Sequence, residues 1–292
     1  MHTPLFQNAL LDEPMSKHTT FGVGGPAAEF VVPETPDELA DAIASCREAG
    51  VPYFVLGKGS DLLVSDEGFD GVIVSLDALV GVRREGDAFV CDAGASLTYV
   101  AKRALYAGLT GFEFACGIPG SIGGACFMNA GAYDGCMADV LESVDVLTPD
   151  GERRTLASDE LDMGYRKSRV RTEGLVVLCA TIRLTPGDRA AIRAKMDDFT
   201  GRRKEKQPLE YGSAGSTFKR PEGYFAGKLI MDAGLMGYQV GGAAVSTKHA
   251  GFVVNLGGAT AADVRAVITH VQDEVERQFG VRLEPEVRFL GW

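Results

Sequence analysis

The sequence predicts an α+β protein of more than one domain, and three observations point to this. The chain has 292 residues, roughly twice the usual length of one domain. It is 46% hydrophobic and 24% charged, like ordinary globular proteins, so a sizeable core is available. Strand and helix patterns alternate near its start, whereas its middle carries strand pairs joined by tight turns.

The N-terminal part predicts a strand, a helix and a second strand. Glu29–Val32 is extended and apolar. Thr35 then caps a helix that begins with Pro36 and ends at Gly50, because threonine suits the cap, proline the first turn and glycine the left-handed end. Val51–Leu56 follows as a short buried strand.

The middle part, about residues 70–186, is rich in strands. Glu85-Gly86-Asp87 and Pro149-Asp150-Gly151 each separate two short apolar runs, as in hairpins. Between them, Ser96 caps a helix that Gly108 ends. The expected strands are Val72–Leu76, Val80–Arg83, Ala88–Cys91, Val144–Leu147, Arg153–Leu156 and Leu175–Leu184.

The C-terminal part predicts three helices and a strand. The first helix begins near Asp188 and runs into a basic stretch at residues 202–206. A short helix at Gly227–Ala233 and a strand at Phe252–Asn255 follow. The last helix is capped by Thr260, with Asp263 in the capping-box position and Gly280 at its end.

Composition excludes several classes of function. There are 29 Lys and Arg against 40 Asp and Glu, and the net charge of −11 disfavours nucleic-acid binding. The six cysteines show neither a C-x-x-C pair nor zinc spacing, and the histidines His2, His18, His249 and His270 do not cluster. We therefore expect buried reduced thiols and no metal site.

The N-terminal segment and the hydropathy pattern bear on location. The first 20 residues have neither a basic start nor a long apolar run, so we expect no signal peptide. No apolar stretch reaches the roughly 20 residues that span a bilayer. We expect a cytoplasmic protein that acts as a monomer on small molecules, without nucleic-acid or membrane partners.

The first glycine motif is Gly57-Lys58-Gly59-Ser60, directly after a predicted strand. Glycine allows consecutive amides to point into one concavity and bind phosphate. The dinucleotide fingerprint is not completed, because Leu62 stands where it requires glycine. A plain tight turn remains about as good an interpretation of this segment.

The second glycine motif is Gly117–Gly124, which holds four glycines, a proline and a serine. Isoleucines can anchor this loop, and a flexible linker would lack them. We interpret it as a rigid anion cradle with free amides, although a tight inter-strand crossing is the alternative. Asn129–Tyr133 could add amide and stacking contacts. Two such loops suggest a dinucleotide ligand.

Three polar segments could carry chemistry. The Tyr165-Arg166 step could offer a guanidinium to a carboxylate, although a surface arginine is the default interpretation. Gly212–Pro221 surrounds Ser216 with small residues beside a local excess of cations, which suits a phosphorylated substrate but also a solvated charge run. No G-x-S-x-G elbow is present. The spacing alone predicts only a surface strand at Leu283–Phe289.

Taken together, these segments resemble one family, the UDP-N-acetylenolpyruvoylglucosamine reductases. Each motif is modestly specific, but their order extends over nearly the whole chain. The short connection after Ser168 resembles the branch that lacks an inserted loop with a substrate-contacting tyrosine. The matching motifs are Lys17–Gly25, Gly57–Leu63, Gly117–Gly124, Asn129–Tyr133, Tyr165–Ser168, Gly215–Pro221 and Leu283–Phe289.

The resemblance implies a fold of the vanillyl-alcohol-oxidase type. Its FAD-binding domain would consist of two subdomains, residues 1–70 and 71–200. A smaller α/β substrate-binding domain would follow at residues 201–283. The tail, residues 284–292, would pack back on the first subdomain.

The resemblance also implies a reaction and its catalytic residues. NADPH would reduce a non-covalently bound FAD, and the reduced flavin would reduce the enolpyruvyl group of a UDP-sugar, giving UDP-N-acetylmuramate for peptidoglycan synthesis. Arg166 would stabilise the substrate carboxylate, Ser216 would donate a proton, and Glu286 would act at the same centre. We expect these three side chains to converge over the flavin ring.

The resemblance further assigns binding residues. Tyr165, Lys219 and Arg220 would contact the substrate. Asp61 and Arg220 depart from the family pattern, since many relatives have asparagine at the first position and one branch has it at the second. The flavin would be bound by Gly57, Lys58, Gly59, Ser60, Asp61, Gly117, Ile118, Pro119, Gly120, Ser121, Gly123, Gly124, Asn129, Gly131 and Ala132.

Two other functions compete with this one. Another FAD-dependent oxidase or dehydrogenase of the same fold would act on a sugar or an alcohol, and such enzymes often tether the flavin to the protein. A nucleotide-binding module without catalysis would be colourless. The fold alone does not separate these functions, whereas the set of Arg166, Ser216 and Glu286 does.

Overall fold

The computed structural model describes residues 4–292, so His2 and the first residues of the N-terminal segment lie outside the described part. The chain forms two compact units that each combine distant segments. Unit 1 contains residues up to Ala9, Val31–Lys58 and Ile73–Arg203. Unit 2 contains Leu10–Phe30, Gly59–Val72 and Lys204–Trp292. The predicted division at residues 70, 200 and 283 follows the sequence order instead and stays a prediction.

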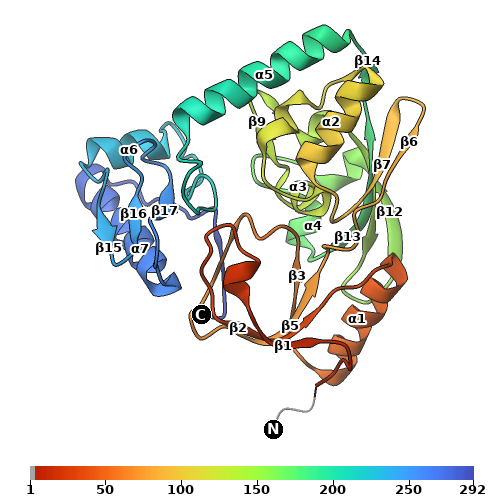
Figure 1. Ribbon diagram of the computed structural model, residues 1–292, viewed down its shortest axis with the longest axis horizontal. Coiled ribbons are helices and arrows are strands. Elements are labelled where there is room, and N and C mark those ends of the chain that lie inside the picture. Colours follow the sequence, from red (N-terminus) through yellow and green to blue (C-terminus); the bar gives the residue numbers. More distant parts are fainter. Residues whose placement is uncertain (1–3) are drawn as a thin grey trace. The chain divides into compact units, whose positions relative to one another are not determined.

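Unit 1 is built on a five-stranded antiparallel sheet in the order β12-β11-β13-β7-β6 (Figure 1). Both predicted hairpins are confirmed, because β6 pairs with β7 and β11 pairs with β12. Helix α3 packs on β13 and β7. The strands are β6 (Val82–Glu85), β7 (Ala88–Asp92), β11 (Leu141–Leu147), β12 (Arg153–Ala157) and β13 (Val176–Arg183).

The helices of unit 1 largely follow their predicted caps. Thr35 accepts a hydrogen bond from the Glu38 amide at the start of α1, and Gly50 ends that helix in the left-handed conformation. Ser96 precedes α2 without a side-chain cap, so its predicted capping bond is wrong. The helices are α1 (Pro36–Ala49), α2 (Leu97–Ala107), α3 (Ile122–Met128), α4 (Arg169–Thr172) and α5 (Arg189–Lys206), whose last three residues belong to unit 2.

Short elements complete unit 1. Strand β5 (Phe69–Ser75) is the neighbour of β3 (Tyr53–Leu56) in a sheet. The remaining strands pair in twos, β8 (Leu109–Thr110) with β14 (Thr185–Pro186) and β9 (Gly131–Ala132) with β10 (Gly135–Cys136). The 3₁₀ helices are η2 (Glu113–Gly117), η3 (Met137–Asp139) and η4 (Ser158–Leu161).

Unit 2 has helix α7 (Ala261–Phe279) packed on a three-stranded sheet and on helix α6 (Ala226–Asp232) (Figure 1). The sheet has the order β15-β16-β17. The predicted capping box of α7 is confirmed, since Thr260 and Asp263 exchange hydrogen bonds with each other's backbone amides. The strands are β15 (Gln239–Val240), β16 (Ala243–Val245) and β17 (Val253–Asn255).

The other part of unit 2 comes from early and late segments of the chain. Strand β1 (Leu10–Pro14) pairs with β2 (Pro26–Val31), and η1 (Met15–Lys17) lies between them. Strand β18 (Arg288–Leu290) pairs in parallel with β4 (Leu62–Val64). The hydrophobic core combines all three segments, for example Phe21, Leu63 and Val267. None of the helices in residues 4–292 is long and apolar enough to cross a membrane.

Candidate functional site

Both glycines of the first glycine turn lie close to other parts of the chain. Gly57 faces the Ser121 side chain in unit 1, where an added Cβ would lie 2.5 Å from Oγ. Gly59, in unit 2, has a φ of +58°, and an added Cβ would lie 1.9 Å from the carbonyl oxygen of His18. Lys58 forms an ion pair with Asp77 at 2.7 Å. This turn therefore requires glycine at two positions for space, and at Gly59 for conformation as well.

The second glycine loop connects η2 to α3, and its amides are only partly free. Ile122 and Gly123 donate to the carbonyls of Ala95 and Ala93 at 2.9 and 2.8 Å, and Ile118 donates to Ala115. Gly124 donates to the Ser121 side chain, which caps α3. The expectation that the loop keeps its amides free is therefore wrong for these positions, because the loop anchors itself to the segment that follows β7 and to η2.

Two amides of this loop stay available. The amides of Gly120 and Ser121 make no hydrogen bond within residues 4–292. The side chain of Ser121 also meets Gly57 in unit 1. The two predicted glycine loops are thus brought together there, which suits a ligand that carries oxyanions.

Arg203 is a half-buried cation beside the second loop. An added Cβ on Gly117 would lie 3.1 Å from its Cδ and 3.3 Å from Nη1. Burial lowers the pKa of Arg203, and within residues 4–292 its guanidinium has no carboxylate partner. A half-buried cation without a carboxylate nearby favours the binding of an anion. In the sequence, Arg203 stands out only as part of a basic stretch.

The Asn129–Tyr133 segment is used structurally in unit 1. Asn129 ends α3 at a φ of +44°, and its side chain donates to the Gly164 carbonyl and accepts from the Ala138 amide, each at 3.0 Å. The Tyr133 ring stacks on Phe199 with centroids 4.3 Å apart. These side chains are therefore committed to protein partners, and backbone groups of Gly131 and Ala132 remain as the candidates for contacting a ligand.

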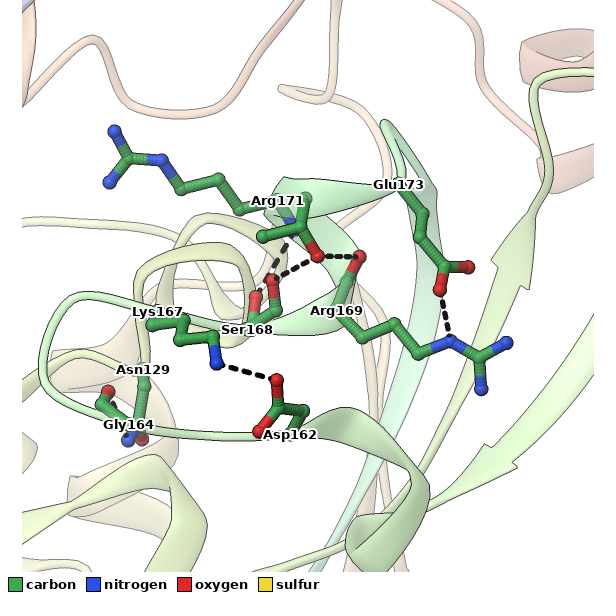
Figure 2. Close-up of polar contacts among 9 residues, drawn as sticks. Asn129, Asp162, Gly164, Lys167, Ser168, Arg169, Arg171 and Glu173 are labelled. Atoms are coloured by element: carbon green, nitrogen blue, oxygen red, sulfur yellow. Dashed lines mark hydrogen bonds and ion pairs between the residues drawn. The ribbon is translucent and has the colours of Figure 1, made fainter.

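The Tyr165–Ser168 segment is a tight turn (Figure 2). Gly164 and Lys167 exchange backbone hydrogen bonds, which places Tyr165 and Arg166 at its tip. Arg166 has a φ of +53°, an uncommon conformation for a residue with a side chain. Its guanidinium lies 5.2 Å from the centre of the Tyr165 ring.

Contacts below this tip hold it in place. The Arg171 guanidinium donates to the Arg166 carbonyl at 3.2 Å. Ser168 is fully buried, and its hydroxyl donates to the Phe127 carbonyl at 2.7 Å and accepts from the Arg171 amide. Lys167 pairs with Asp162 at 2.6 Å. The fixed turn presents Arg166 in one backbone conformation, as a positioned guanidinium requires.

The Ser216 segment of unit 2 pairs with the Glu286 segment. Phe218 and Pro285 form an antiparallel bridge, the Glu286 amide donates to the Thr217 carbonyl at 2.8 Å, and the Lys219 amide donates to the Glu284 carbonyl at 2.9 Å. Ser216 is exposed and follows Gly215, whose φ is +74°. The backbone of Glu286 therefore lies beside the residue after Ser216.

The cations beside Ser216 have different surroundings. Lys219 pairs with Glu284, and its side chain is only 19% exposed. This ion pair neutralises Glu284 with a lysine of the Ser216 segment. The guanidinium of Arg220 lies 3.9 Å from the centre of the Phe225 ring, which holds the charge near the segment.

The structure therefore groups the predicted residues in two sets. Unit 1 holds Gly57, Lys58, the second loop, Asn129–Ala132, Tyr165 and Arg166. Unit 2 holds Gly59, Ser60, Asp61, Ser216, Lys219, Arg220 and Glu286. Convergence of Arg166 with Ser216 and Glu286 stays a prediction.

Glu113 is a buried carboxylate that the sequence analysis missed. It accepts hydrogen bonds from the Thr110 hydroxyl at 2.5 Å and the Gly111 amide at 3.0 Å, and Lys195 lies 3.5 Å away. Although desolvation opposes it, this set of partners lowers the pKa of Glu113. Its position at the start of η2 ties the second loop to α5. The sequence signal that could have indicated this residue is the position of Glu113 between Phe112 and Phe114, where a carboxylate is expected to be buried.

The thiols are free, and four of the six are buried as predicted, while Cys136 and Cys179 are half-buried. Burial raises the pKa of Cys91 and of Cys179 to about 12, so these thiols are unreactive at neutral pH. Among residues 4–292, no group of three or more His, Cys, Asp or Glu could hold a metal ion.

Comparisons with known proteins match both parts of the chain. Residues 27–157 match the family model for an FAD binding domain, and residues 207–290 match that for the C-terminal domain of UDP-N-acetylenolpyruvoylglucosamine reductase. The first match covers the predicted flavin loops, and the second covers Ser216 and Glu286. The α+β fold with a flavin-binding part and a second domain is thereby confirmed.

Relatives of this kind align over nearly the whole chain. The chain is 54% identical to the UDP-N-acetylenolpyruvoylglucosamine reductase of Clostridium perfringens over 98% of its length and 94% of the relative's. It is 52% identical to that of Clostridium beijerinckii, over 96% and 92%. The crystal structure of the enzyme from Thermus caldophilus superposes with a TM-score of 0.83 at 37% identity, covering 97% of this chain and 98% of the other. The chain thus belongs to the UDP-N-acetylenolpyruvoylglucosamine reductase family.

Proposed function

We propose that this chain is an FAD-dependent oxidoreductase that uses NADPH to reduce UDP-N-acetylenolpyruvoylglucosamine to UDP-N-acetylmuramate, a peptidoglycan precursor. The observation that carries this function is the pairing of the Ser216 segment with the Glu286 segment in a chain that also has an FAD-binding part. A flavin-binding part alone would fit many oxidoreductases, whereas the serine, glutamate and arginine set fits this reaction.

The residues present fit FAD. Gly57 meets Ser121, the Gly120 and Ser121 amides are available, and Arg203 supplies a cation for an anionic group. The assigned flavin contacts therefore lie in the two glycine turns and the Gly131–Ala132 backbone, with Arg203 added to them. When bound, FAD supplies the redox chemistry by taking electrons from NADPH and delivering hydride to the enol ether double bond.

Arg166 stabilises the charge that develops on the substrate carboxylate. Addition of hydride to the terminal carbon of the enolpyruvyl group places negative charge on the adjacent carbon and its carboxylate. A guanidinium held in one place interacts more strongly with this charge than with the ground state, which lowers the barrier. The contact of Arg171 with the Arg166 carbonyl supports this assignment, because it fixes the turn.

Ser216 donates the proton that completes the reduction, and Glu286 assists at the same centre. A serine hydroxyl is a very weak acid, so the transfer requires a strongly basic carbon and the exclusion of water. Lys219, Arg220 and Tyr165 contact the substrate. The bond from the Glu286 amide to the Thr217 carbonyl supports this assignment, because it holds the Glu286 backbone beside the Ser216 segment.

We also propose the remaining properties expected of this function. The protein is a cytoplasmic monomer whose partners are the UDP-sugar and NADPH, with no nucleic acid or membrane among them. Its FAD-binding subdomains are residues 1–70 and 71–200, and residues 201–283 form the substrate-binding domain. Pairing of β18 with β4 supports the return of the tail at residues 284–292 to the first subdomain.

The test is a visible spectrum of the purified protein supplied with FAD. NADPH is expected to bleach the flavin absorbance, and the enolpyruvyl UDP-sugar is expected to restore it without oxygen. Failure of the sugar to restore the absorbance, while another sugar or an alcohol supports turnover, would favour a different flavoenzyme. A protein that takes up no FAD would contradict the proposal entirely.

A further inference from the structure

A half-buried histidine, His249, supports the loop behind Ser216, and the proposed mechanism gives it no role. Its Nδ1 accepts a hydrogen bond from the Gly251 amide at 3.1 Å. Its ring packs edge-on against Phe252, with centroids 4.9 Å apart. An added Cβ on Gly251 would lie 3.1 Å from the ring's Cε1, so glycine permits this close approach. His249 therefore fixes the peptide of Gly251.

Gly251 in turn holds the Ser216 segment. Its carbonyl accepts a hydrogen bond from the Thr217 amide at 2.8 Å, and the Thr217 carbonyl accepts one from the Glu286 amide, also at 2.8 Å. The Thr217 hydroxyl accepts a third bond from the Val253 amide at 2.9 Å. All these groups belong to unit 2. A continuous set of hydrogen bonds thus runs from the imidazole to the residue after Ser216 and on to Glu286.

Further contacts restrict the histidine itself. The Ser246 hydroxyl accepts hydrogen bonds from the Lys248 and His249 amides at 3.1 and 3.3 Å. An added Cβ on Gly227, in the first turn of α6, would lie 3.6 Å from the ring. Burial lowers the pKa of His249, so the ring is neutral at pH 7 and Nδ1 keeps the lone pair that accepts the Gly251 bond.

We infer that His249 is a positioning residue for the proposed reduction: by accepting the Gly251 amide at Nδ1, it holds the backbone of Thr217 and Glu286 in register. The inference rests on the proposed function, because it assigns roles to Ser216 and Glu286. The imidazole does not need to touch the substrate. What matters is an acceptor at the δ position of this side chain.

Substitutions at His249 can distinguish the effect of the hydrogen-bond acceptor at Nδ1 from the effect of the volume of the ring. Leucine fills similar space without an acceptor, asparagine offers an oxygen near the position of Nδ1, and glutamine offers one further out. In the FAD-loaded protein, we expect His249→Leu to slow reoxidation of the reduced flavin by the enolpyruvyl sugar about tenfold, as loss of about 1.4 kcal/mol would. Reduction by NADPH should change less than twofold. His249→Asn should restore most of the rate, and His249→Gln should not.

A matched control is His270→Leu. His270 lies on α7 and stacks on Tyr238 with centroids 3.9 Å apart. The His270→Leu variant therefore also loses a ring contact in unit 2. We expect it to leave the reoxidation rate unchanged. Amide hydrogen exchange gives a second readout that does not depend on turnover. Exchange at Gly251 and Thr217 should accelerate in His249→Leu and return toward the wild-type rate in His249→Asn.

Several results would overturn the inference. Reoxidation of His249→Leu at the wild-type rate would do so, as would equal rates in the leucine and asparagine variants. If the leucine variant does not fold, equal rates in the asparagine and glutamine variants would reject the role of the δ acceptor. A wild-type protein whose reduced flavin the enolpyruvyl sugar cannot reoxidise would instead reject the proposed function, so the two failures remain distinguishable.

Discussion

The second glycine loop of unit 1 and the paired segments of unit 2 reach their geometry by different routes. In the loop, local caps contribute directly, since Ser121 caps α3 and Asn129 ends it, beside the longer-range bonds from Ile122 and Gly123 to Ala95 and Ala93. In unit 2, Lys219 and Glu284 are 65 positions apart and meet only through tertiary pairing. We expect the glycine loop to be sensitive to changes that alter its backbone. The paired segments of unit 2 can lose one side chain and keep their backbone pairing.

The largest expected effect tests whether the paired segments of unit 2 can lose one side chain and keep their backbone. Ser216→Ala removes the proposed proton donor but leaves the backbone pairing, and positioned proton transfer is worth about 10²–10⁴-fold. We expect flavin reduction by NADPH to stay nearly intact and reoxidation by the enolpyruvyl sugar to fall by about 10³-fold, measured by stopped-flow absorbance.

Ser213→Ala is the matched control for Ser216→Ala. Ser213 meets Thr20 through its backbone amide and carbonyl, so its side chain can be removed without breaking these bonds. The control should react like the wild type. If both half-reactions of Ser216→Ala keep their rates, Ser216 is not the acid.

The next effect tests whether the first glycine turn is as sensitive to backbone changes as we expect the second loop to be. Gly59 and Gly86 have nearly the same φ, +58° and +60°, but an added Cβ clashes with the His18 carbonyl only at Gly59 and meets nothing within 4 Å at Gly86. Left-handed strain costs about 1–2 kcal/mol, and overpacking adds about 1–3 kcal/mol. Gly59→Ala should therefore lower the free energy of unfolding in urea by about 3 kcal/mol, against about 1 kcal/mol for Gly86→Ala. Equal losses would mean that space at the turn does not matter.

A smaller effect concerns the half-buried cation. Arg203→Gln removes the guanidinium beside Gly117, and one charge-assisted hydrogen bond to an anionic ligand is worth about 1.5–3 kcal/mol. We expect the Kd for FAD, measured by fluorescence quenching, to rise about tenfold or more. Arg202→Gln is the control, because Arg202 already pairs with Asp198 and its side chain is 48% exposed. The same Kd in both variants would remove Arg203 from the flavin site.

The smallest effect concerns the carboxylate at the start of η2. Because the folded-state pKa of Glu113 is lowered, its stabilisation is present above the unfolded pKa and is lost as the pH falls through the folded value. From about pH 5 to about pH 3, wild-type stability should therefore fall more steeply than that of Glu113→Gln. Urea unfolding across this pH range measures the free energy of unfolding of both proteins. Parallel plots of that free energy against pH would contradict the stabilising role of ionised Glu113.

The sequence predicted the local features of the fold well, because their causes lie within a few residues. Thr35, Thr260 and Gly50 mark helix ends by capping chemistry that needs no distant partner. The Ser96 cap failed because distant residues intervene: its neighbour Leu97 donates its amide to Gly120, and Ser96 lies in a bridge with Ser121. A tertiary contact there replaced the local one.

The candidate site was less predictable from residue chemistry. Nothing in the spacing of Glu284 and Glu286 distinguishes them, and the ion pair of Glu284 with Lys219 forms only in the folded unit. The positive φ of Arg166 has no sequence signal either, because tertiary bonds from Arg171 and Asn129 impose the turn. Resemblance to a family supplied these residues, whereas periodicity and composition could not.

The parallel pairing of β18 with β4 has a consequence for how the polypeptide folds as it is synthesised. The partner of Leu62–Val64 is translated more than two hundred residues after it, and Asp66 caps the α7 amides of Ala261 and Ala262, which also emerge late. The early segments of unit 2 must therefore leave the ribosome with an open strand edge, which is prone to pairing with other chains. We therefore expect this strand edge to need protection from aggregation, for example by a chaperone, until the late segments have been synthesised.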